Sequence, residues 1–123
     1  MTRVPVRALT VLHDPDCPVC RRAVWWLRRQ PARVPIEFVA AASAEARRRF
    51  PALDHAATLQ RITVIGDGRA VFTGDKAWLV CLWALRDHRD MASFLSSTAG
   101  RPIARAMAGG AEWLRHALAA ARA

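Results

Sequence analysis

The stretch Ala8-Leu9-Thr10-Val11-Leu12-His13-Asp14-Pro15-Asp16-Cys17-Pro18-Val19-Cys20 (residues 8–20) contains the strongest structural signals of the chain. Its first six residues are mostly apolar and predict a short buried strand from Ala8 to His13. The turn-forming residues Asp14-Pro15-Asp16 then end that strand. A C-x-x-C pair follows at once, so both cysteines are expected where the first strand gives way to the next element.

The cysteine pair is expected to open a helix. Either Cys17 or Asp16 can cap a helix that has Pro18 in its first turn and runs to about Arg29. Positions 17, 20, 24 and 27 follow a 3-4-3 spacing and therefore share one helical face. Cys20 should point partly inward, whereas Cys17, at the helix start, is expected to meet solvent.

The rest of the chain continues the alternation of strands and helices. The expected elements are a strand Ile36–Ala40, a helix Ala44–Phe50, a hairpin with strands Ile62–Ile65 and Arg69–Phe72 around Gly66-Asp67-Gly68, an apolar helix Lys76–Leu85, a short helix capped by Asp90 and reaching about Ser97, and an alanine-rich basic tail Pro102–Arg122, broken by Gly109-Gly110 and amphipathic around Trp113, Leu114 and Leu118. The order β-α-β-α-β-β-α predicts a three-layer α/β fold with a mixed sheet and extra C-terminal helices.

Length and composition limit the classes of protein that the chain can represent. With 123 residues the chain fits a single domain, residues 1–123, with a core of about 7–88 and a C-terminal helical extension of about 90–123. The longest apolar stretch, Ala77 to Leu85, is too short for a membrane span, and the first ten residues lack the apolar region of an export signal, so a cytoplasmic location is expected. The net charge of +9 comes from scattered arginines without an aromatic-interleaved basic stripe, so no nucleic-acid partner is expected.

A C-x-x-C at a helix start has the chemistry needed for disulfide exchange. The nucleophile is the thiolate, which the helix dipole, the unpaired N–H groups and the nearby arginines favour at Cys17, while acidic neighbours oppose it. Cys17 is therefore assigned as the attacking thiol and Cys20 as the resolving thiol. Asp14 is a candidate proton acceptor for Cys20, although it can also serve only to organise the turn, and that second interpretation is preferred for Asp16.

The segment His13-Asp14-Pro15-Asp16-Cys17-Pro18-Val19-Cys20-Arg21-Arg22 resembles the DCC family of thiol-disulfide oxidoreductases, thioredoxin-like proteins named for one aspartate and two cysteines. Asp14, Cys17 and Cys20 match those three residues. A weaker resemblance continues through the hairpin and the segment Phe72-Thr73-Gly74-Asp75-Lys76-Ala77, so that it covers roughly residues 8 to 86. It implies a thioredoxin-like fold, catalysis by the dithiol, no bound cofactor, protein or small-molecule thiols and disulfides as partners, and an external reductant system.

The chain departs from these families at three places. Pro15 stands where the DCC family usually has glycine, and proline fixes φ near −65°. His13 stands where an aromatic residue is common in that family. Thioredoxins themselves have a cis-proline just before the hairpin, whereas here no proline occurs between Pro51 and Pro102, and Gln60 or Arg61 takes that place.

Two other functions remain open from the residues alone. A C-x-x-C is also half of a zinc or iron–sulfur site, which Cys81, His13 or His55 would have to complete, although Cys81 is more simply a small core residue. The arginine-rich chain could instead be a basic adaptor for anionic surfaces, with its tail as a membrane or partner helix. The substrate, the direction of exchange and the oligomeric state do not follow from the sequence.

Overall fold

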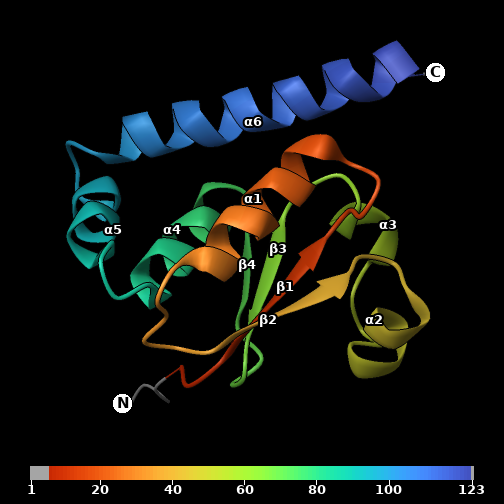
Figure 1. The fold of residues 1–123 in the computed structure, drawn as a ribbon, viewed down its shortest axis with the longest axis horizontal. Helices are drawn as coiled ribbons and strands as arrows, with labels where there is room; N and C mark the ends of the chain where they lie inside the picture. Colours follow the sequence, from red (N-terminus) through yellow and green to blue (C-terminus); the bar gives the residue numbers. More distant parts are fainter. Residues whose placement is uncertain (1–5, 123) are drawn as a thin grey trace.

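The computed structural model describes residues 6–122, without the side chains of residues 119, 121 and 122. Its four strands are β1 (Leu9–His13), β2 (Ile36–Ala40), β3 (Thr63–Gly66) and β4 (Val71–Thr73). Within that range the helices are α1 (Pro18–Arg29), α2 (Ala44–Arg49), α3 (His55–Thr58), α4 (Asp75–Ala84), α5 (Arg89–Ser96) and α6 (Arg101–Arg122) (Figure 1). The segment 1–10, on which the expected lack of an export signal rests, lies partly outside the described residues.

The strands form one mixed sheet in the order β2-β1-β3-β4. β1 pairs in parallel with β2, from Leu9 opposite Ile36 to His13 opposite Ala40, and α1 makes the crossover between them. β1 pairs antiparallel with β3, and β3 antiparallel with β4. The first strand is therefore central, and its carboxyl end leads directly into the cysteine segment.

Helices cover both faces of this sheet. Leu9 and Val11 of β1 pack with α1 and α4 in one core, around the fully buried Cys81. Leu12, on the alternate face, packs with Val39 and with residues of α2 and the loops beside α3 in a second core. Figure 1 shows α1 and α4 on one side of the sheet and α2 on the other. The predicted three-layer, thioredoxin-like α/β fold is confirmed.

The hairpin turn and two short helices differ in detail from the expected elements. The hairpin forms as predicted, and the residue with a left-handed backbone in its turn is Arg69 (φ 70°), which directly follows Gly68. The short helix α5 begins one residue before Asp90, and His88 occupies its N-cap without a side-chain hydrogen bond, so the capping role predicted for Asp90 is wrong. The helix α3, only four residues long and capped by Asp54, was not predicted because such a segment shows no helical periodicity.

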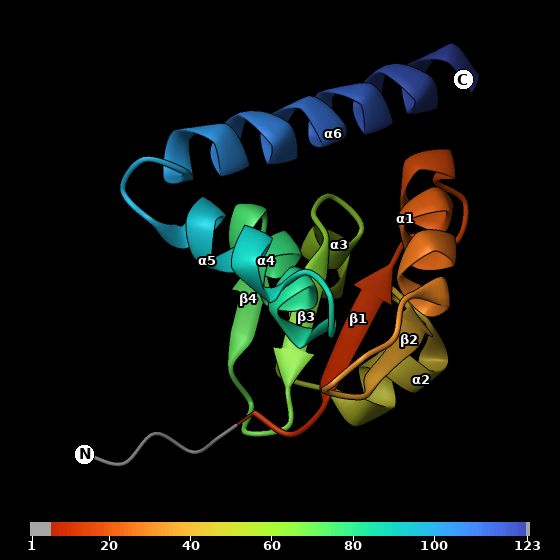
Figure 2. The same cartoon turned by 60° about the vertical axis from the view of Figure 1, so that its left-hand side comes forward.

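The C-terminal tail differs most from the prediction. Gly109 and Gly110 do not break it, since α6 is one continuous helix of 22 residues. Glycine costs a helix only about 1 kcal/mol relative to alanine, and the surrounding alanines favour the helix. The helix packs against α1, α4 and α5 and crosses the end of the molecule at which β1 finishes and α1 starts (Figure 2). The division into a core and a separate extension stays a prediction.

Candidate active site

Cys17 is the N-cap residue of α1. Its backbone is extended (φ −93°, ψ 119°), and its Sγ accepts a hydrogen bond from the backbone N–H of Cys20 at 3.5 Å. Pro18 follows in the first turn, where a helix does not use the missing N–H. The sulfur thus takes the place of the hydroxyl or carboxylate oxygen that usually caps a helix, at the positive end of the helix dipole. The predicted start of the helix is confirmed.

The loop before the helix is organised by Asp14. Its carbonyl accepts a hydrogen bond from the Cys17 N–H at 3.2 Å, and its Oδ1 accepts one from the Asp16 N–H at 3.0 Å. No peptide bond between residues 6 and 122 is cis, so Pro15 is accommodated in the trans form. Asp14 therefore has the turn-forming role that the sequence allowed, and its carboxylate keeps one oxygen for another partner.

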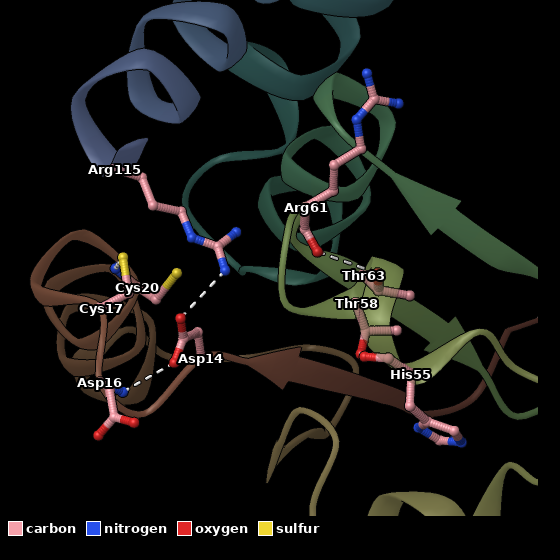
Figure 3. Close-up of polar contacts among 9 residues, drawn as sticks. All are labelled: Asp14, Asp16, Cys17, Cys20, His55, Thr58, Arg61, Thr63 and Arg115. Atoms are coloured by element: carbon pink, nitrogen blue, oxygen red, sulfur yellow. Dashed lines mark hydrogen bonds and ion pairs between the residues drawn. The ribbon is translucent and has the colours of Figure 1, made fainter. Parts of the chain in front are cut away.

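That partner comes from the far end of the chain. Arg115, in the C-terminal half of α6, is 8% exposed, and its Nη2 lies 3.4 Å from Asp14 Oδ2. Figure 3 shows the guanidinium group reaching from α6 down to the carboxylate beside the two cysteines. A second ion pair, Arg61 to Glu112 at 3.6 Å, joins the same helix to the segment before β3. Both contacts hold α6 over the start of α1.

Both thiols are covered in consequence. Cys17 is 2% exposed and Cys20 is 8% exposed, and both are free cysteines. The inward orientation predicted for Cys20 is confirmed, but the exposure predicted for Cys17 is wrong. The prediction considered only the start of the helix. The element that covers this start, α6, comes about one hundred residues later in the chain.

Cys17 still borders an opening to solvent. A pocket of about 300 Å³ is lined by Asp14, Asp16, Cys17, Leu59, Gln60, Arg115 and His116. Gln60 thus lies beside Cys17, in the neighbourhood that the sequence indicated for the residue replacing the cis-proline of thioredoxins. Most of the lining residues are polar or charged.

Cys20 is held as a neutral thiol. Burial, helped by the hydrogen bond with Cys17, raises the pKa of Cys20 from 9.0 to about 11, while the positive charge of Arg115 and the backbone of Asp14 act in the opposite direction. At neutral pH this sulfur is therefore protonated, and it needs a proton acceptor before it can attack.

The residues considered for a metal site are dispersed. Cys81 is a fully buried residue of α4, where burial raises its pKa to about 12, as expected for a core thiol. His55 is buried beside α3, with its Nε2 2.9 Å from the carbonyl oxygen of Phe50. Burial, followed by the charge of Arg28, lowers the pKa of His13. Across residues 6–122 no three His, Cys, Asp or Glu side chains come together as metal ligands.

A central mixed sheet with a C-x-x-C at the start of the first crossover helix defines the class of thioredoxin-like dithiol proteins. Comparison with protein families identifies the chain further, because the model of the DCC1-like thiol-disulfide oxidoreductases matches residues 11–119. The chain belongs to this family. No curated protein and no solved structure matches it. The match includes most of α6, which the resemblance found in the sequence did not reach.

Arg115 is the site residue that sequence reasoning missed. It lies on the same helical face as Ala104 and Ala108, which are buried against the rest of the protein. An arginine aligned with small buried residues was the available signal, but it gives no indication of which carboxylate it meets.

No helix in the described part of the chain is long and apolar enough to cross a bilayer.

Proposed function

We propose that this chain is a thiol–disulfide oxidoreductase in which Cys17 and Cys20 alternate between the dithiol and the disulfide. The observation that supports this most directly is the cap geometry, in which Cys17 Sγ accepts a hydrogen bond from the Cys20 N–H at the start of α1. The same N–H and the helix dipole stabilise negative charge on that sulfur. Membership of a thiol-disulfide oxidoreductase family supports the same chemistry.

The exchange takes two balanced steps. The Cys17 thiolate attacks one sulfur of a substrate disulfide, forming a mixed disulfide on Cys17 and releasing the other substrate sulfur as a thiolate. Cys20 then gives up its proton and attacks the Cys17 sulfur, which forms the Cys17–Cys20 disulfide and releases the second substrate thiol. Two electrons pass from the protein to the substrate. An external thiol system returns them by the reverse exchange, and no bound cofactor takes part.

In this mechanism Asp14 accepts the Cys20 proton. Its backbone contacts the Cys20 thiol, and its carboxylate lies in the loop directly before the helix. The same carboxylate pairs with Arg115 at 3.4 Å, so the proposed acceptor lies beside the guanidinium group that reaches over the site. The polar pocket beside Cys17 is the route by which small thiols and disulfides reach the site, and protein substrates need displacement of α6. We place this chemistry in the cytoplasm, as the cysteine usage suggests.

A redox titration tests the proposal. Chelator-treated protein is equilibrated in glutathione buffers of graded potential, quenched by alkylation and analysed by mass spectrometry. One intramolecular disulfide between Cys17 and Cys20 should form reversibly, and Cys81→Ser should leave the titration unchanged. Cys20→Ser should trap glutathione on Cys17, while Cys17→Ser should trap little, since Cys20 stays protonated. The proposal is wrong if the two sulfurs remain reduced in the most oxidising buffer.

A further inference from the structure

The outward side of α6 is apolar along most of its length. Exposed on this side are Ile103, Ala106, Met107, Trp113, Leu114 and Ala117, with Met107 at its edge beside α1 and α4. Trp113 is 71% exposed and Met107 is 62% exposed, the two highest values among the large apolar side chains. These six residues are called the outer face below. The amphipathic pattern expected around Trp113 and Leu114 lies on a helix, and both of these side chains are exposed.

No other described element covers the outer face. Figure 2 shows α6 at the margin of the molecule, with the sheet and the other helices all on its inner side. That inner side already has its own contacts, through Ala104, Ala108 and Arg115. Soluble monomers rarely leave a contiguous apolar surface of this kind exposed without a use for it.

The charge of the chain indicates the kind of partner. Arg101 and Arg105 are exposed on the side of α6 that borders α4 and α5, and the acidic residue of that side, Glu112, is paired with Arg61 at 3.6 Å. The whole chain has a net charge of +9. A second copy with the same charge is repelled, whereas an anionic surface is attracted. An apolar helical face that includes tryptophan, on a strongly basic chain, matches helices that lie in a membrane interface.

A neighbouring pocket favours lipid acyl chains over a protein surface as the partner. From Met107 the apolar surface continues into a pocket of about 330 Å³ between α1, α4, α5 and α6, where Trp26 and Met91 also line the wall. Asp75 is the one charged residue among those lining it. Acyl chains can adapt to an irregular apolar hollow, whereas a protein surface needs a matching shape.

We propose that the outer face of α6 docks this protein onto membrane surfaces that contain anionic lipids. The helix lies in the plane of the interface and does not cross the bilayer. Trp113, Met107 and Leu114 enter the boundary between headgroups and acyl chains, and the positive charge of the chain attracts it to the anionic headgroups. This property is independent of the disulfide chemistry.

Vesicle sedimentation tests the docking with the whole 123-residue chain. The wild type should sediment with vesicles of phosphatidylcholine and phosphatidylglycerol, and much less with phosphatidylcholine alone. The double variant Met107→Glu/Leu114→Glu should lower partitioning at least about tenfold. Its matched control, Ala52→Glu/Ala56→Glu, makes the same change of charge at exposed positions before and within α3 and should lower partitioning at most about threefold. Circular dichroism checks that both variants are folded.

Tryptophan emission gives a second readout that does not depend on the charged variants. Emission should shift to the blue with anionic vesicles, and Trp113→Phe should lose most of the shift while still sedimenting. Equal loss of binding in the two double variants would contradict the proposal, as would equal binding to neutral and anionic vesicles. A wild-type dimer that ignores vesicles and that Met107→Glu/Leu114→Glu converts to monomer would assign the outer face to a second copy instead.

Discussion

Cys17 combines a structural and a chemical role in one side chain. Its sulfur caps α1, so its replacement alters stability as well as reactivity. Serine is a good N-cap residue, and alanine is a poor one. We expect Cys17→Ser to keep the free energy of unfolding within about 0.5 kcal/mol of the wild type, and Cys17→Ala to lower it by about 1 kcal/mol. Urea unfolding of the reduced proteins measures both. If alanine costs no more than serine, the cap has no energetic weight.

The raised pKa of Cys20 predicts a loss of stability at alkaline pH. The thiol ionises near pH 9.0 in the unfolded chain but near pH 11 in the folded protein, so its contribution to stability is fully present below pH 9. As the pH rises from 9 toward 11, the unfolded chain ionises first and the folded state loses roughly 2 kcal/mol. The chain has no tyrosine, and Lys76 is its only lysine, so few other groups titrate in this window.

Reduced protein unfolded in urea between pH 8 and pH 10.5 measures this loss. Cys20→Ser should flatten the pH dependence, while the contribution of the fully buried Cys81 remains in both proteins. Identical slopes for the wild type and Cys20→Ser would show that Cys20 keeps an ordinary pKa in the folded state.

Among the elements, α6 offers a paired test of two glycines. A Cβ added at Gly109 meets no atom within 4 Å, whereas one added at Gly100, just before the helix, would lie 2.0 Å from the carbonyl oxygen of Phe94. Gly109→Ala should therefore raise the free energy of unfolding by about 0.5–1 kcal/mol, or the melting temperature by roughly 2–6 °C. Gly100→Ala should lower it, because backbone atoms must shift. Calorimetry compares the two, and a stabilised Gly100→Ala protein would contradict the close approach.

Local signals in the sequence were enough to predict the sheet and the helix that bears the cysteines. Alternating apolar residues, turn residues and Pro18 act over a few positions, and β1, α1, β2 and the hairpin followed from them. The course of α6 depends on packing against α1, α4 and α5, which no local pattern contains. For this reason the burial of Cys17 and the contact between Asp14 and Arg115, which are 101 residues apart, could not be predicted.

At the scale of the whole molecule, the cover formed by α6 predicts selection by size. Iodoacetamide can enter a pocket of about 300 Å³, whereas a polyethylene-glycol maleimide cannot. For each reagent, the rate with Cys17 is divided by its rate with a free thiol. In the wild type this ratio should therefore be at least about tenfold lower for the large reagent than for the small one. Arg115→Ala removes the contact with Asp14 and should reduce that difference to about threefold or less.

Arg105→Ala is the matched control for this measurement. Arg105 is an exposed arginine of the same helix, and it does not line the pocket beside Cys17. It should keep the size dependence of the wild type. An Arg115→Ala protein that excludes the large reagent as strongly as the wild type would mean that other contacts hold the cover in place.

Trp113 and Arg115 are two residues apart in α6, about 3 Å along its axis, yet they leave it on opposite sides. The helix is unbroken between them and past the glycine pair. It therefore behaves as a stiff rod, and a roll or a tilt imposed at the indole displaces the guanidinium by a comparable amount. A force applied at the exposed surface of α6 therefore changes how far the two sulfur atoms are covered, and the sheet need not move.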